Sequence, residues 1–138
     1  MIRVAISGYF NPIHIGHIKY MEEAKSLGDE LIVIVNNDAQ VKLKGSKSFM
    51  NEQDRLAIVR AIKYVDRAIL SIDTDRTVKK TLTELSPDVF AKGGDSTDTN
   101  VPELSICEQL GIAVVMGVGG NKIQSSSKLL KGISESNT

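Results

Sequence analysis

The chain has 138 residues, enough for one compact domain and too few for two. Its 17 basic and 17 acidic residues cancel, so no long-range positive field attracts nucleic acid. The apolar run Leu31–Val35 is too short to cross a bilayer, and one cysteine can form neither an internal disulfide nor a structural zinc site. We expect one cytoplasmic domain over residues 1–138, with no signal segment, no membrane or nucleic-acid partner, and a frayed tail at 134–138.

Strand-like and helix-like patterns alternate along the chain. Short apolar or β-branched runs predict strands at residues 2–6, 31–35, 68–70, 88–91 and 112–116. Apolar residues at helical spacing predict helices at about 15–27, 51–65, 76–85, 104–110 and 125–133. Residues 41–50 and 117–120 are expected to be loops. Gly28 and Gly111 stand where C-terminal caps belong, and Asn51 where an N-terminal cap belongs.

Strands that alternate with helices need right-handed crossovers and therefore a parallel sheet. The sequence predicts an α/β domain with a single doubly wound, five-stranded parallel sheet, in a Rossmann-like three-layer αβα arrangement. In such a sheet, ligands bind beyond the carboxyl ends of the strands, where the strand order reverses. The loops that follow the strands are therefore the segments to search for function.

Two histidines lie in the first of these loops. His14 and His17, the only histidines in the chain, flank Gly16 at the start of the first predicted helix. Free N–H groups and the helix dipole favour an anion there, and a glycine lets a phosphate approach the backbone. The imidazoles can donate hydrogen bonds to phosphate oxygens as charge builds up in a transition state. The alternatives are partly buried structural histidines, or metal ligands, for which no third ligand is suitably placed.

The stretch His14-Ile15-Gly16-His17 resembles the HxGH signature of the cytidylyltransferase-like nucleotidyltransferases. This family includes glycerol-3-phosphate cytidylyltransferase, heptose 1-phosphate adenylyltransferase, archaeal FAD synthetase and nicotinamide mononucleotide adenylyltransferase. Further similar segments extend the resemblance over nearly the whole chain: 24–31, 35–38, 51–55, 64–66 and 92–95. The resemblance implies that a phosphate oxygen of an acceptor attacks the α-phosphorus of a nucleoside triphosphate and releases pyrophosphate. Mg²⁺ is expected to help neutralise the triphosphate, and a homodimer is expected.

The resemblance also implies which residues form the site. His14, His17 and Lys44 are the candidate catalytic residues, with the backbone at Tyr9 and Phe10 holding phosphate. The full set expected at the nucleotide is Tyr9, Phe10, Asn11, His14, Gly16, His17, Gly94, Asp95, Ser125, Ser126 and Ser127. Lys42, Arg55 and Lys122 are candidates for phosphate or acceptor binding.

Each of these assignments has a simpler alternative. The lysines at 42, 44 and 47 can belong to a solvated basic loop, and Arg55 can pair with Glu52 one turn earlier. Asp95 can stabilise a turn, and one of the serines at 125–127 can be a plain helix cap. Cys107 falls on the apolar stripe of its helix and is expected in the core.

Three departures from the family pattern stand out. Asn11 replaces an aspartate of the glycerol-phosphate enzymes, although Asn-Pro also occurs in the nicotinamide mononucleotide enzymes. Residues 121–124 lack the usual phosphate-binding arginine, whose place Lys122 can take. Residues 96–99 lack the usual aromatic or charged companion of Asp95, which bears on how the acceptor is recognised.

We expect a nucleotidyltransferase that transfers NMP to a small phosphorylated acceptor. The loop Lys92-Gly93-Gly94-Asp95 favours ATP and a sugar phosphate of the heptose 1-phosphate type. The alternatives are CTP with glycerol phosphate, a polyol phosphate or a phosphonate, then FAD or NAD synthesis. A module that binds a nucleotide without turnover is the alternative outside enzymes.

Overall fold

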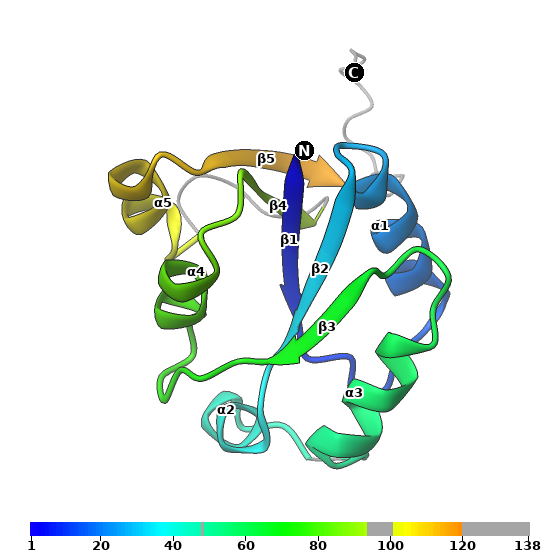
Figure 1. Cartoon of the computed structure of the whole chain (residues 1–138). Helices are drawn as coiled ribbons and strands as arrows, with labels where there is room; N and C mark the ends of the chain where they lie inside the picture. Colours follow the sequence, from blue (N-terminus) through cyan, green and yellow to red (C-terminus); the bar gives the residue numbers. More distant parts are fainter. Residues whose placement is uncertain (48, 94–100, 120–138) are drawn as a thin grey trace, which may run out of the picture.

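The computed structural model describes residues 1–47, 49–93 and 101–119. It contains one five-stranded parallel sheet with the order β3-β2-β1-β4-β5, which confirms the predicted doubly wound fold (Figure 1). The strands are β1 (Arg3–Gly8), β2 (Glu30–Val35), β3 (Arg67–Leu70), β4 (Val89–Gly93) and β5 (Ala113–Val118). Strand β2 is buried at five successive positions from Leu31 onward, as a central strand covered on both faces requires.

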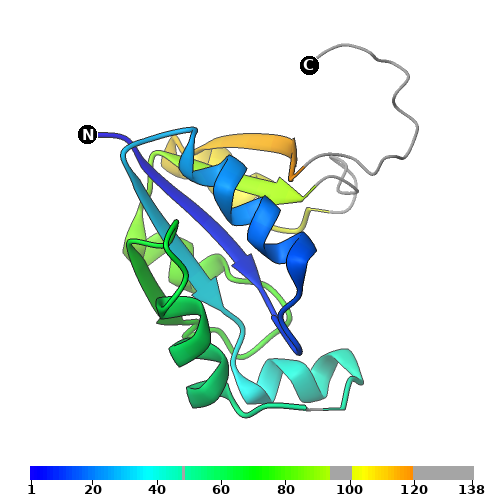
Figure 2. The same cartoon turned by 90° about the vertical axis from the view of Figure 1, so that its right-hand side faces the viewer.

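Helices cover both faces of the sheet and make the predicted three layers. Helices α1 (Ile15–Lys25) and α3 (Glu52–Arg60) pack on one face, and α4 (Lys79–Leu85) and α5 (Leu104–Leu110) on the other (Figures 1 and 2). The core on the α1 and α3 side includes Val4, Ile6, Met21, Leu31, Val33 and Val59. The core on the α4 and α5 side includes Ala5, Ile34, Leu82, Phe90 and Cys107, which confirms the predicted burial of the cysteine.

The strand order reverses at β1. The chain passes from β1 to β2 and β3 on one side and then crosses to β4 and β5 on the other. Strand β1 stays paired with β2 as far as Gly8, but its pairing with β4 includes only Val4 and Ala5. The carboxyl end of β1 is therefore the topological switch point, where open sheets of this class bind ligands.

A helix replaces the first part of the loop expected at 41–50, after β2. Helix α2 (Asp38–Lys44) lies beyond the carboxyl ends of the strands (Figure 1). Asn37 and Gln40 form a capping box at its start, and Gly45 ends it with a φ of 82°. The prediction was wrong because this helix is too short to show a period. Its caps define it, together with the buried side chains of Gln40 and Val41.

Some element ends also differ from the prediction. Helix α1 ends with Ser26 as its C-cap, and Gly28 is small for another reason, since a Cβ there would lie 2.8 Å from side-chain atoms of Ile2 and Val4. Helix α4 begins at Lys79 rather than at 76. Just inside it, the Asp73 carboxylate accepts hydrogen bonds from backbone N–H groups at 80 (2.7 Å) and 81 (3.0 Å).

Other boundaries are confirmed or shifted slightly. Asn51 is the N-cap of α3 and Gly111 the C-cap of α5, as predicted. Helix α3 ends at Arg60, before the expected end at 65, and β5 extends through residues 117 and 118. The helix predicted at 125–133 and the tail at 134–138 lie outside the described residues. Within the described part of the chain, none of the helices has the length and apolar character that a membrane span needs.

Candidate active site

A pocket of about 340 Å³ opens beside the switch point. It lies where the loop between β1 and α1 meets the end of α2. Its walls are formed by Tyr9, Phe10, Asn11, Pro12, His14, His17, Lys44 and Ser46. The structure thus brings the predicted catalytic residues, which come from two separate segments, to one cavity.

The two histidines are held by the backbone at the start of α1. His14 is the N-cap, and its Nδ1 accepts a hydrogen bond from the Gly16 N–H at 3.1 Å. The backbone N–H of His14 in turn donates to Nδ1 of His17 at 3.0 Å. The ring centroids are 3.9 Å apart with a tilt of 30°. Because Nδ1 accepts in both rings, a neutral imidazole carries its proton on Nε2. Both residues are therefore prepared as Nε2–H donors.

His17 is neutral at neutral pH. Burial, and then the neighbouring imidazole of His14, lower the pKa of His17 to about 4. The edge of the Phe10 ring also packs against His17, with centroids 5.0 Å apart and an interplanar angle of 76°. At neutral pH this residue therefore offers an Nε2–H donor without carrying a charge of its own.

Gly16 has a second role besides the expected approach of phosphate. A Cβ at this position would lie 2.9 Å from Cε1 and 3.1 Å from Nδ1 of His14. The imidazole folds back over the glycine, so a side chain here would displace the ring from its capping position. The glycine between the histidines is required by the histidine geometry itself.

Asn11 fixes one wall of the pocket. Its amide nitrogen donates to the carbonyl of Lys47 at 2.8 Å, and its Oδ1 accepts from the N–H groups of Phe49 (2.9 Å) and Met50 (3.3 Å). The side chain thus ties the β1–α1 loop to the segment before α3. Both the amide nitrogen and the amide oxygen of Asn11 are therefore used within the protein, and the residue shapes the site by holding the loop in place.

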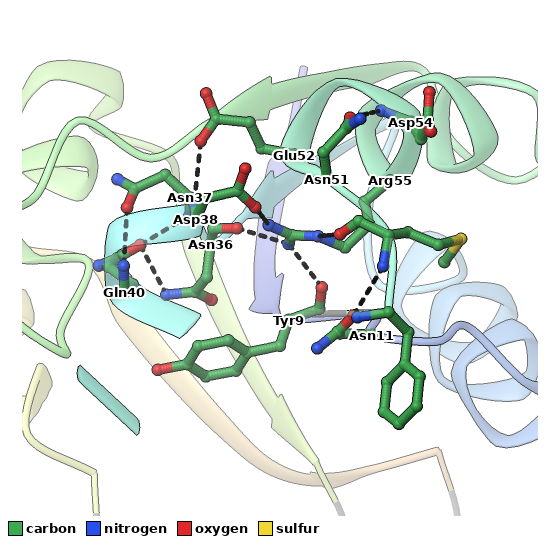
Figure 3. Close-up of polar contacts among 12 residues, drawn as sticks. Tyr9, Asn11, Asn36, Asn37, Asp38, Gln40, Asn51, Glu52, Asp54 and Arg55 are labelled. Atoms are coloured by element: carbon green, nitrogen blue, oxygen red, sulfur yellow. Dashed lines mark hydrogen bonds and ion pairs between the residues drawn. The ribbon is translucent and has the colours of Figure 1, made fainter. Parts of the chain in front are cut away.

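Arg55 is not among the residues that line the pocket, and its guanidinium contacts backbone carbonyls and a carboxylate (Figure 3). That it binds phosphate or the acceptor stays a prediction. Its side chain is 0% exposed. The guanidinium donates to the carbonyls of Tyr9 (2.8 Å), Asn36 (2.6 Å) and Met50 (3.1 Å). It also pairs with the Asp38 carboxylate at 2.8 Å, whereas the sequence suggested Glu52. The spacing in the sequence pointed to Glu52 of the same helix, but the carboxylate that pairs with Arg55 is Asp38 of α2.

Glu52 and the start of α2 complete this buried cluster. Glu52 accepts a hydrogen bond from the Asp38 N–H at 2.8 Å. Gln40, fully buried, accepts at Oε1 from the amide of Asn36 and the N–H of Asn37, both at 3.0 Å. Sequence analysis missed Asn36, Asp38 and Gln40. The available signals were their place directly after a predicted central strand and the family resemblance at 35–38.

The lysines of α2 divide into one at the pocket and one away from it. Lys44 lines the pocket, and its Nζ lies 4.3 Å from the centroid of the Tyr9 ring. Lys42 instead lines a neighbouring cavity of about 540 Å³, which shares Ser46 with the first. Ser46 and Pro12 are pocket residues that sequence analysis did not single out. The remaining predicted residues, Gly94, Asp95, Lys122, Ser125, Ser126 and Ser127, lie outside the described part of the chain.

The donor set of the pocket suits an anion rather than a metal ion. Its described side chains offer imidazole N–H groups and an ammonium group and include no carboxylate. Across the described residues, no group of three His, Cys, Asp or Glu side chains is placed to hold a metal. These residues do not fit a resident Mg²⁺, which prefers oxygen ligands.

Known proteins similar to this chain share its family and fold. The cytidylyltransferase-like family model matches residues 5–128. FAD synthase of Thermoplasma volcanium is 38% identical over 138 aligned positions, and the match covers 98% of this chain and 96% of that protein. FAD synthase of Archaeoglobus profundus is 47% identical over 95 residues, 69% of this chain and 59% of that protein. A solved structure described as the lipopolysaccharide core biosynthesis protein from Thermoplasma volcanium GSS1 is 40% identical, with a TM-score of 0.73, and the match covers 84% of this chain and 93% of that one.

The similarity settles the family and revises the expected closest type. The loop at 92–95 favours a heptose 1-phosphate enzyme, whereas the relatives just described are named FAD synthase. The family match spans most of the chain, and one relative matches along nearly its full length. The chain belongs to the cytidylyltransferase-like family and is a nucleotidyltransferase.

Proposed function

We propose that the protein is an FMN adenylyltransferase that transfers AMP from ATP to FMN and so forms FAD and pyrophosphate. The pair of Nε2–H donors at the start of α1 supports the transfer chemistry. N–H donors at the start of a helix suit the negatively charged oxygens of a triphosphate. The name shared by the 38% and 47% identical relatives supports FMN as the acceptor.

The reaction needs positioning and charge neutralisation rather than a protein nucleophile. An oxygen of the FMN phosphate forms the new bond to the α-phosphorus of ATP. The bond from that phosphorus to the α–β bridging oxygen breaks, and its electron pair leaves with pyrophosphate. His14 and His17 donate to oxygens on which charge accumulates, and Lys44 swings from Tyr9 to a phosphate. Mg²⁺ enters as part of the Mg–ATP substrate, bound to phosphate oxygens and water.

Residues beyond the described part of the chain keep their proposed roles. Asp95 with Gly94 is proposed to bind the nucleoside, and Ser125, Ser126, Ser127 and Lys122 the phosphates. Their support is the family resemblance in the sequence. Asn11 and Arg55 are proposed to position the loop that carries the phosphate-binding backbone, since their side chains are engaged in it.

A sugar phosphate is the second candidate acceptor. The 40% identical solved chain is described as a lipopolysaccharide core biosynthesis protein, and the loop at 92–95 resembles that of heptose 1-phosphate adenylyltransferase. The same chemistry would then join AMP to heptose 1-phosphate. The acceptor, not the mechanism, separates the two candidates.

An acceptor panel tests the proposal. Purified protein is incubated with Mg²⁺, with ATP or CTP, and with FMN, heptose 1-phosphate or glycerol 3-phosphate. Pyrophosphate release and the nucleotide product are both measured, and the His17→Ala variant is the control for contaminating activity. We expect pyrophosphate and FAD in equal amounts from ATP and FMN only. Turnover with heptose 1-phosphate and none with FMN would make the sugar phosphate the acceptor. Nucleotide binding without any pyrophosphate release would refute the proposal of an active enzyme.

A further inference from the structure

The ring of Tyr9 is a part of the pocket that the transfer chemistry does not use. The Tyr9 carbonyl is fixed by Arg55, while its ring points away from the guanidinium (Figure 3). The ring lines the pocket, and the ammonium group of Lys44 lies 4.3 Å from its centroid. Among the described residues, nothing forms a hydrogen bond with its hydroxyl. The feature that Tyr9 offers the pocket is therefore an aromatic face on a rigid backbone.

Aromatic residues are scarce in this chain, which makes the position of Tyr9 informative. The sequence has three tyrosines, three phenylalanines and no tryptophan. The neighbouring Phe10 is 2% exposed and packs against His17, so it serves the interior. Tyr9 is only half-buried, and its face is covered by a lysine that the reaction needs elsewhere. A cation over an aromatic ring is held weakly at an exposed site, so the face is easily vacated.

We propose that the Tyr9 ring is the platform on which the flat ring of the acceptor stacks, exposed when Lys44 moves to phosphate. This inference rests on the proposed function, since the isoalloxazine of FMN is a flat aromatic system and a sugar is not. Stacking on an aromatic side chain suits such a ring because each has a π-face. Tyr9 then selects the acceptor class, while the histidines act on phosphate.

The position of Tyr9 assigns it to the acceptor rather than to the nucleobase. The nucleoside is proposed to lie at the loop after β4, on one side of β1. Tyr9 instead meets Lys44 of α2, which follows β2 on the other side of β1. A ring stacked on Tyr9 therefore stays clear of the nucleoside proposed on the other side of β1, while its phosphate attacks the α-phosphorus opposite the leaving pyrophosphate.

The test compares Tyr9→Leu with Tyr9→Phe. We expect Tyr9→Leu to raise the KM for FMN about ten- to a hundredfold and to leave the KM for ATP unchanged. Tyr9→Phe keeps the ring and is expected to retain the KM for FMN. Tyr64→Leu is the matched control, because Lys63 Nζ lies 5.2 Å above the Tyr64 ring in a similar pair that does not line the pocket. A second readout is the quenching of FMN fluorescence with a non-hydrolysable ATP analogue present, which Tyr9→Leu should abolish.

The outcomes separate this inference from the proposed function. If wild type makes FAD and Tyr9→Leu keeps both the KM for FMN and the quenching, the platform is refuted and the function stands. A raised KM for ATP alone would move the stack to the nucleobase and refute the acceptor assignment. If Tyr9→Phe is as defective as Tyr9→Leu, the hydroxyl is responsible, not the ring. If wild type makes no FAD from FMN, both proposals fall.

Discussion

The side of the pocket formed around Arg55 and the side formed around the histidines are built in opposite ways. Around Arg55, the buried guanidinium already donates to three carbonyls and one carboxylate. Around His14 and His17, each ring uses Nδ1 for the backbone, and no described residue hydrogen-bonds to Nε2. On the Arg55 side the polar groups are bonded to one another and form a scaffold. On the histidine side the Nε2–H groups are available to bind a ligand. Tyr9 belongs to both sides, with its carbonyl in the scaffold and its ring in the pocket.

Arg55→Ala is the strongest test of the scaffold side. We expect a loss of about 3–5 kcal/mol in the free energy of unfolding, because buried acceptors lose their charged donor. Urea unfolding measures this loss. Arg60→Ala, in the same helix but exposed, is the matched control and should cost far less. A loss under about 1 kcal/mol together with collapsed turnover would make Arg55 a substrate ligand instead.

His17→Ala is the strongest test of the donor side. We expect kcat to fall about 10²- to 10³-fold, the usual cost of removing one donor from a developing negative charge. The variant also loses the acceptor for the His14 N–H, which costs about 1 kcal/mol of stability. His17→Gln separates the effects, since glutamine at this position of a capping box restores that acceptor. Wild-type kcat in His17→Ala would remove the histidine from the mechanism.

Asn11→Asp tests the hydrogen bonds that tie the β1–α1 loop to the segment before α3. The substitution keeps the acceptor for the N–H groups of Phe49 and Met50 but sets an oxygen against the Lys47 carbonyl, now bonded at 2.8 Å. We expect a stability loss of about 1–2 kcal/mol and a raised KM for ATP. Thermal unfolding and steady-state kinetics measure the two effects. Unchanged stability would show that the loop is held by other contacts.

The pH dependence of stability tests the histidine side in a second way. The pKa of His17 is about 4 in the folded protein, below the ordinary value of 6.5, so the unfolded chain binds a proton more readily between these values. Its contribution to stability is complete above about pH 6.5 and declines as pH falls toward 4. Denaturant unfolding of wild type and His17→Gln across this range isolates the contribution. Identical pH profiles would contradict the lowered pKa.

Much of the fold was predictable because buried strands and amphipathic helices leave periodic apolar patterns in the sequence. The all-apolar run 31–35 and the alternation of strands with helices were sufficient for the parallel sheet. Helix α2 was missed because its definition lies in caps and two buried side chains, not in a period. The start of α4 was placed too early because its first turn is held by the Asp73 carboxylate, seven and eight residues before the bonded N–H groups, and not by a capping residue beside the helix.

The candidate site divides in the same way. His14 and His17 were predictable because their spacing and their place after the first strand carry the motif. The role of Arg55 was not, because three of its four partners lie 17, 19 and 46 residues away. Such long-range hydrogen bonds leave no local pattern. The contact of Lys44 with the Tyr9 ring could likewise not be predicted, because it depends on the placement of α2.

The most direct test of the account is the protonation pattern of the two histidines. The chain has only two, so a long-range ¹H–¹⁵N NMR spectrum of the imidazole rings assigns them with two single variants. We expect both rings to carry a proton on Nε2 and none on Nδ1 at neutral pH, and the ring signals to move when a non-hydrolysable ATP analogue with Mg²⁺ is added. A proton on Nδ1 in either ring, or signals unmoved at saturating analogue, would contradict this expectation.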